Sequence, residues 1–305
     1  MSAKTWLPWS LVPPLPRARP LTPAVLAELL DGGQAFRWNR DADGVLSGGW
    51  AGHHARLRIA PGSGELEFSA PSGADARALA SALQAYLAGP PADEDVLPWR
   101  SDPHLASCMA AFPGLRILRQ PFGETLLGFV CSATKQIVQI KRMLELLALR
   151  HGQVAPGGWR RLPDWRELAG IPEKDLRACG LGFRARHVAG IARFLAAEPG
   201  WLEATEHAPY ADAKARLLEL PGVGEKVADC VLLFGAGRLE AFPVDTWIVK
   251  AMARRYGLEE WRPAQVAHFG RIHFGAQAGL AQQFLFAFER AADVEKRRRG
   301  NANDA

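Results

Sequence analysis

Four short strand-like segments lie in the first third of the chain, at 35–39, 44–50, 55–60 and 65–69, and hydrophobic and polar residues alternate clearly around the last two. Such alternation is typical of antiparallel strands that bury one face. A helix is predicted to begin at Thr22 and Pro23, because a hydroxyl cap followed by proline favours a first helical turn. A second, alanine-rich helix is predicted at 75–88. This part of the chain is therefore expected to mix strands and helices.

Apolar residues recur at helical spacing from about residue 113 onward. The longest stretch of this kind is 125–149, and its apolar face is interrupted at 132–136. Further helices are predicted at 173–179, 184–196, 211–219, 225–236, 246–256, 262–273 and 278–291. The larger part of the chain is thus predicted to be a helical body.

The predicted fold class is α+β, with a small antiparallel sheet domain followed by this helical body. We predict a first domain at 1–112, which includes a proline-rich arm at 1–20, and a helical domain at 113–291. The basic segment 292–305 is predicted to be a disordered tail. Because prolines interrupt the apolar arm, it is not expected to form a targeting helix.

The composition is typical of a globular protein, with 48% hydrophobic and 23% charged residues among 305. A net charge of +5 permits a nucleic-acid partner. The four cysteines, Cys108, Cys131, Cys179 and Cys230, are too widely spaced for a zinc site or a disulfide framework. We therefore expect reduced thiols and no metal. No other cofactor and no membrane partner are expected either. The expected location is the cytoplasm in a bacterium or the nucleus in a eukaryote.

The most informative stretch is 220–230, LPGVGEKVADC, which predicts a tight hairpin between two helices. Gly222 and Gly224, on either side of Val223, allow a sharp turn with exposed backbone amides. A helix that begins at such a turn offers unpaired N–H groups to a phosphate. Lys226 then places a nucleophilic amine in the first turn of the second helix. The alternative for this lysine is a solvated surface side chain.

Several motifs, in order along the chain, resemble the helix-hairpin-helix DNA glycosylases, and most closely the 8-oxoguanine DNA glycosylase/AP lyases. They are GQAFRW at 33–38, RILRQ at 116–120, FVCS at 129–132, LGFRAR at 181–186, the hairpin, FPVDTW at 242–247 and QQFLF at 282–286. The resemblance covers roughly residues 20–290. It implies a DNA repair enzyme that acts on double-stranded DNA with a damaged base, as an expected monomer.

In this family the lysine of the hairpin forms a Schiff base, and the resemblance assigns that role to Lys226. The amine attacks C1′ of the deoxyribose as the base leaves, and β-elimination then breaks the strand. A bifunctional glycosylase and lyase is therefore implied. Asp245 is implied to stabilise the positive charge that develops on the sugar. An aspartate directly before a helical run is also a standard N-cap, and both interpretations can hold.

The resemblance also assigns a pocket for a base that is flipped out of the duplex. Phe286 would stack on the base, Gln282 would hydrogen-bond to its Watson–Crick edge, and Cys230 would pack on the other face. The carbonyl of Gly33 would accept N7–H, which 8-oxoguanine has and guanine lacks. Core packing is the alternative for Phe286 and Cys230, and a helix-ending glycine is the alternative for Gly33.

Some DNA-contacting positions depart from the family pattern. Thr134, Lys135 and Gln136 stand where three asparagines are usual, and the first of these normally fills the gap left by the flipped base and contacts the orphaned cytosine. Gln139 replaces one of two arginines that contact the same cytosine, whereas Arg184 remains at the other position. A solvated arginine at a helix start is the alternative for Arg184. The preference for the base opposite the lesion is therefore open.

Two other functions use related features. A glycosylase for alkylated bases without lyase activity has the same scaffold, but such enzymes lack the lysine at position 226. A non-catalytic DNA-binding module would need neither Lys226 nor Asp245. Trp247 stands where a phosphate-binding histidine is common, so its role is open. Iron–sulfur glycosylases are disfavoured because their cysteine cluster is missing from the sequence.

Overall fold

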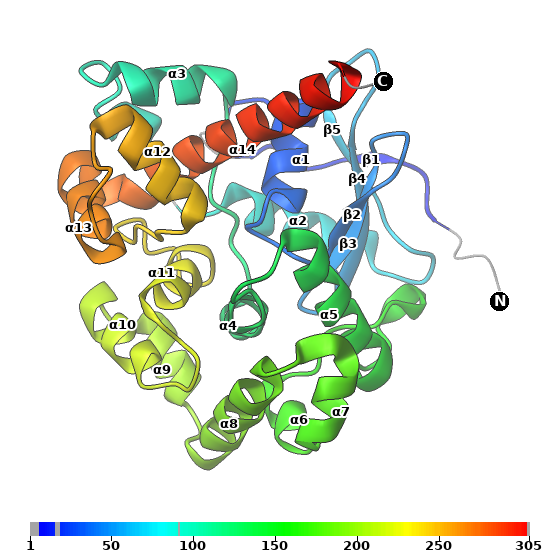
Figure 1. Cartoon of the computed structure of the whole chain (residues 1–305). Helices are drawn as coiled ribbons and strands as arrows, with labels where there is room; N and C mark the ends of the chain where they lie inside the picture. The colour runs from blue at the N-terminus through cyan, green and yellow to red at the C-terminus, as the bar shows by residue number, and fades with distance from the viewer. Residues whose placement is uncertain (1–5, 16–18, 91, 304–305) are drawn as a thin grey trace.

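Figure 1 shows a β-sheet at one side of the molecule and helices that fill the rest. The structure is a computed structural model, and it describes residues 6–15, 19–90 and 92–303, with side chains up to residue 294. This arrangement confirms the predicted α+β class. None of the helices in these ranges is long and apolar enough to span a bilayer.

The strands of the described residues form one antiparallel sheet in the order β1-β5-β4-β3-β2. They are β1 (Ser10–Leu11), β2 (Trp38–Arg40), β3 (Leu46–Trp50), β4 (His53–Ile59) and β5 (Leu66–Ser69). Alternation in β4 turns Ala55 and Leu57 into the core, where both are fully buried. Helix α1 (Pro23–Asp31) packs against this side of the sheet, and Thr22 caps it as predicted. Strand β1, in the proline-rich arm, was not predicted, because two residues carry too little alternation.

The remaining helices follow the predicted order. They are α2 (Ala76–Ala88), α3 (Pro103–Ala111), α4 (Phe122–Cys131), α5 (Ile137–His151), α6 (Trp165–Ala169), α7 (Glu173–Leu176), α8 (Arg184–Ala197), α9 (Trp201–His207), α10 (Tyr210–Leu218), α11 (Glu225–Phe234), α12 (Thr246–Tyr256), α13 (Pro263–Phe274) and α14 (Ala278–Asn303). The interruption at 132–136 is a loop that separates α4 from α5. The sequence analysis missed α3, α6 and α9, which are too short to show a clear apolar period.

The predicted disordered tail at 292–305 is wrong for the part that the structure describes. Helix α14 runs on to Asn303, and residues 304–305 lie outside the described residues. The physical reason is local, because 290–299 contains neither glycine nor proline and is rich in alanine, glutamate, lysine and arginine, which favour helix. Charge alone was therefore a poor argument for a disordered end.

Helix α4 lies near the middle of the molecule (Figure 1). Every residue from Thr125 to Cys131 is buried, as expected for a helix that is apolar on all sides. The carboxyl end of α4 leads into the loop at 132–136, and its amino end carries Glu124. One continuous core joins the sheet side to the helical body, and α3 packs on α14. The domain boundary at 112 stays a prediction.

Candidate active site

The predicted hairpin connects α10 to α11. Gly222 has φ +81°, and a Cβ there would come within 2.3 Å of Nδ1 of His187, so glycine is required for both conformation and space. Gly224 is the N-cap residue of α11 and has no side-chain cap, which leaves backbone N–H groups at this helix start open to a phosphate. Both glycines are exposed, whereas Val223 is buried and anchors the turn.

A buried charged cluster fixes α11 against α10. Asp229 on α11 is 2% exposed, accepts a hydrogen bond from the Tyr210 hydroxyl at 2.7 Å and forms an ion pair with Lys214 at 2.9 Å. Lys214 also pairs with Glu225 at 2.7 Å. The sequence analysis gave this cluster no role, although an aspartate within the apolar run of α11 was a visible signal. These contacts set the rotation of the helix that carries Lys226.

The amine of Lys226 points toward the carboxyl end of α4. Its Nζ lies 3.4 Å from Oγ of Ser132 and 5.2 Å from the centre of the Phe129 ring. Ser132 donates its own hydroxyl proton to the Phe129 carbonyl at 2.7 Å, so its oxygen is available to accept from Lys226. Neither Ser132 nor Phe129 was predicted to contact the lysine. Contacts from two sides therefore restrict the position of this amine.

Cys230 lies one helical turn after Lys226 and is buried. Burial raises the pKa of its thiol to about 12, although the nearby lysine acts in the opposite direction. The thiol is therefore neutral at pH 7, and Cys230 can pack against a ligand but is not an anionic partner for Lys226. Its predicted contact with a base stays a prediction.

Asp245 is the N-cap residue of α12. Its Oδ1 accepts from the backbone N–H of Trp247 at 3.0 Å and of Ile248 at 2.9 Å. Burial raises the pKa of the carboxyl above the ordinary aspartate value, while these N–H groups and Lys226 oppose the shift. The structural interpretation of Asp245 is thus confirmed. The charge of Lys226 is thus close enough to act on this carboxyl.

Three of the predicted base-pocket residues make contacts that can be described. Gln282 lies beside the segment that carries Asp245, and Gly33 and Phe286 lie beside each other. Gln282 on α14 is 3% exposed and donates to the carbonyl of Pro243 at 3.0 Å. Phe286 lies one turn further along α14, and its Cζ is 3.8 Å from the position that a Cβ on Gly33 would take. Gly33 has φ +114°, so a side chain there would be strained. The structure brings Gly33 and Phe286 together, and their contacts with a base stay predictions.

The loop at 132–136 projects three exposed side chains, those of Thr134, Lys135 and Gln136. Thr134 has φ +55°, which is costly for a β-branched residue. Arg184 is only 2% exposed, and its guanidinium donates to the Ala133 carbonyl and, at 2.9 Å, to the Thr134 hydroxyl. Arg184 therefore stabilises this loop through buried hydrogen bonds. The alternative interpretation, a solvated arginine at a helix start, is wrong. Its direct contact with DNA stays a prediction.

Replacing Arg184 with alanine is expected to lower the free energy of unfolding by about 1–3 kcal/mol, because the partly buried Ala133 carbonyl would lose its donor. Urea unfolding measures this change. Arg186→Ala is the matched control, since Arg186 is exposed on the same helix and should change stability by less than about 0.5 kcal/mol. Equal effects of the two substitutions would refute a supporting role for Arg184.

Gln139 and Trp247 are two further positions at which the sequence differs from the family pattern. The side chain of Gln139 accepts from the backbone N–H of Gln136 at 3.2 Å and so closes the first turn of α5. Trp247 is half-buried in the first turn of α12, where Nζ of Lys250 lies 5.2 Å from the centre of its ring. Within the described ranges, no group of three or more His, Cys, Asp and Glu side chains could hold a metal ion.

The combination of a helix-hairpin-helix with a lysine and an aspartate on adjoining helix starts is the arrangement of helix-hairpin-helix DNA glycosylases. Residues 19–126 match the family model described as 8-oxoguanine DNA glycosylase, N-terminal domain. The chain is 30% identical over 276 residues to the N-glycosylase/DNA lyase OGG1 of Arabidopsis thaliana. The aligned residues cover 84% of this chain and 75% of that protein. This chain belongs to the 8-oxoguanine DNA glycosylase family.

Two further comparisons agree with this assignment. A probable N-glycosylase/DNA lyase of Methanothermobacter thermautotrophicus is 30% identical over 230 residues, which are 68% of this chain and 73% of that protein. The crystal structure of the Clostridium acetobutylicum 8-oxoguanine glycosylase/lyase, in complex with double-stranded DNA containing cytosine opposite the lesion, superposes with a TM-score of 0.81. It is 28% identical and covers 88% of this chain and 92% of that chain.

Proposed function

We propose that this protein removes 8-oxoguanine from duplex DNA and then breaks the strand as an AP lyase. The observation that carries the proposal is the Lys226 amine, held at the carboxyl end of α4, together with the Asp245 carboxylate at the first turn of α12. A phosphate-binding module alone needs neither group. The named activities of the relatives support the same conclusion.

The reaction has two covalent stages. As the glycosidic bond breaks, its electron pair leaves with the base and Nζ of Lys226 bonds to C1′, while Asp245 stabilises the positive charge on the sugar. Loss of a proton from nitrogen and opening of the ring give an imine. A proton then leaves C2′, and the 3′ phosphate departs with the C3′–O electron pair. The imine is therefore the electron sink for strand cleavage.

Recognition of the base uses Gly33, which follows α1, together with side chains of α14 and α11. The duplex is opened at a cost of a few kcal/mol, and stacking and edge hydrogen bonds offset that cost. Phe286 supplies the stacking face and Gly33 the carbonyl that accepts N7–H of the oxidised base. Gln282 is oriented by its bond to Pro243 and hydrogen-bonds to the Watson–Crick edge, while Cys230 lines the opposite face as a neutral thiol.

Two exposed elements contact the DNA outside the base pocket, the hairpin at Gly222 and Gly224 and the loop at 132–136. The amides at Gly222 and Gly224 bind one phosphate. The loop with Thr134, Lys135 and Gln136 enters the space that the flipped base leaves. One flipped base needs one pocket, so the protein acts as a monomer. It works where the DNA is, in the bacterial cytoplasm or the eukaryotic nucleus.

Single-turnover excision tests the proposal, with duplexes that carry 8-oxoguanine opposite each of the four bases. We expect release of 8-oxoguanine and no release of guanine from a matched duplex, because guanine lacks N7–H. A duplex with an alkylated adenine serves as the competing substrate. Release of the alkylated base alone would replace the proposed function with that of an alkylation-repair glycosylase.

Thr134→Asn is expected to raise the preference for cytosine over adenine opposite the lesion by about tenfold, because the longer amide can hydrogen-bond to the cytosine edge. Asparagine also tolerates the positive φ of this position better than threonine. The ratio of single-turnover rates on the two duplexes measures the effect. Lys135→Asn is the control one residue away, and an equal rise with that variant would contradict a specific role for position 134.

A further inference from the structure

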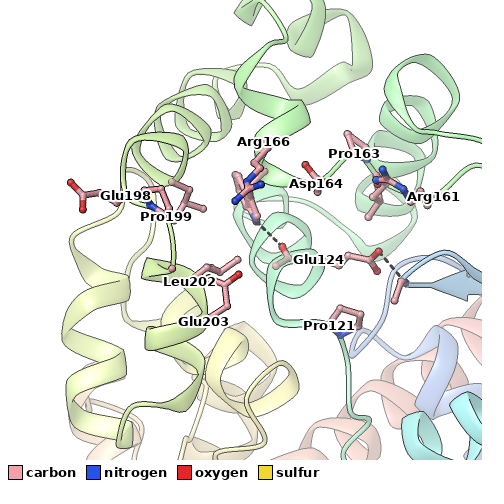
Figure 2. A pocket seen from close by; sticks show the side chains of 16 residues that line it. Pro121, Glu124, Arg161, Pro163, Asp164, Arg166, Glu198, Pro199, Leu202 and Glu203 are labelled. Atoms are coloured by element: carbon pink, nitrogen blue, oxygen red, sulfur yellow. Dashed lines mark hydrogen bonds between the residues drawn. The ribbon is translucent and has the colours of Figure 1, made fainter.

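A cavity of about 500 Å³ lies at the amino end of α4, between residues 161–166 and the junction of α8 with α9 (Figure 2). It is separate from the active site. Helix α4 spans ten residues, or about 15 Å, and Lys226 contacts Ser132 beyond the opposite end. The volume lies within the range of about 300–1,000 Å³ that is common for small-molecule sites.

The cavity has a rigid apolar wall. Trp165 is buried, and its indole N–H donates to the Gly123 carbonyl at 3.0 Å, which fixes the ring against the first turn of α4. Pro121, Leu162 and Leu202 add further apolar surface. A ligand that fits this wall has an apolar body of its own.

Some charged groups of the cavity are already occupied by contacts within the protein, and those that remain are mostly acidic. Arg161 makes a double hydrogen bond to Glu167, with both distances 2.7 Å, so its guanidinium already has a carboxylate partner. Asp164 caps α6 through a bond from the Glu167 N–H at 2.8 Å. Within the described part of the chain, the side chains of Glu203 and Arg166 form no hydrogen bond or ion pair.

Glu124 is the carboxylate nearest the core. Its Oε1 accepts from the Ala51 N–H at 3.1 Å, and no other hydrogen bond to its carboxylate is present among the described residues. Burial raises the pKa of Glu124, while the guanidinium groups of Arg37 and Arg161 act in the opposite direction. A cation placed beside Oε2 would favour the ionised form. Glu124 and Glu203 thus give the lining two carboxylates against the guanidinium of Arg166, which has no carboxylate partner among the described residues.

We propose that this cavity binds a small organic cation, an aliphatic amine or guanidine, with Glu124 and Glu203 as its anionic partners. Glu203 lies in the first turn of α9, where the helix dipole favours an ionised carboxylate. The hydrocarbon part of the ligand lies against Trp165 and Leu202. DNA is not the ligand, because carboxylates repel phosphates. This site is independent of the proposed base-excision activity.

Isothermal titration of the DNA-free protein tests the site with two probes, 1,4-diaminobutane and agmatine. The uncharged isostere 1,4-butanediol is the control ligand. We expect saturable binding of at least one amine with one site per chain, and no binding of the diol. Absence of binding by both amines, or equal binding of the diol, would overturn the proposal.

Two variants identify the anionic partners. Glu124→Gln keeps an oxygen that can accept the Ala51 N–H, so the fold is retained while the charge is lost. Both Glu124→Gln and Glu203→Gln should weaken amine binding about tenfold. Glu219→Gln, exposed and outside the cavity, should bind like the wild type. Unchanged affinity in both cavity variants would refute the assignment. Excision of 8-oxoguanine should be unaffected in all three, so the two proposals can fail separately.

Discussion

Lys226→Gln is expected to abolish the covalent complex with DNA and to reduce strand cleavage by at least about a thousandfold. The amide of glutamine is not nucleophilic, so neither the bond to C1′ nor the imine can form. Folding should be retained, because the amine is held by a hydrogen bond to Ser132 and a contact with the Phe129 ring rather than by a short ion pair. The glutamine side chain can keep the first of these.

Borohydride trapping on duplexes with 8-oxoguanine measures this effect, since it reduces the imine to a stable bond. Lys174→Gln is the control, because Lys174 is an exposed lysine on α7, away from the hairpin. Both variants should bind the duplex, and only Lys226→Gln should fail to be trapped. A trapped complex with Lys226→Gln at the wild-type yield would assign the nucleophile to another amine.

Asp245→Asn is expected to slow base excision by about 10²–10³-fold, the usual loss when one group that stabilises transition-state charge is removed. Asparagine retains an Oδ1 that can accept from Trp247 and Ile248, so the cap of α12 survives. Single-turnover excision rates and urea unfolding together separate chemistry from stability. Asp245→Ala is the comparison, since it should lose the charge and also about 1 kcal/mol of cap stabilisation.

The pH dependence of excision gives a second test of Asp245. Only the ionised carboxylate stabilises the sugar cation, and burial raises the pKa of this group. Excision by the wild type should therefore fall as the pH drops through that raised pKa, above the pH at which an ordinary aspartate is protonated. Asp245→Asn should lose this acid limb. An acid limb that persists in the variant would assign it to a different group.

The placement of Asp245 and Lys226 could be predicted because their signals are local. The predicted helix at 246–256 matches α12, since an N-cap aspartate and a glycine after Tyr256 mark its ends within a few residues. Likewise Gly222 and Gly224 indicate a turn whatever residues lie around them, because glycine tolerates the backbone conformations that a tight turn needs. The interruption of the apolar face at 132–136 located the loop between α4 and α5.

The errors have an equally physical origin. The burial of Arg184 could not be read from the sequence, because only the return of the loop near Ala133 shows it, and its predicted contact with DNA stays a prediction. The short helices α6 and α9 carry too few turns to show a period. The basic end was assigned to disorder from its charge, although its residue types favour the helix that α14 forms.

The sequence by itself determined the fold class, the hairpin and the chemical groups of the candidate site, because caps, glycines and apolar periods act over a few residues. Tertiary structure alone decided which groups meet. Ser132 lies 94 residues from Lys226, and Gln282 lies 39 residues from Pro243. Packing around α4 also formed the cavity beside Glu124. Such contacts depend on how distant segments fill one core, which no local pattern specifies.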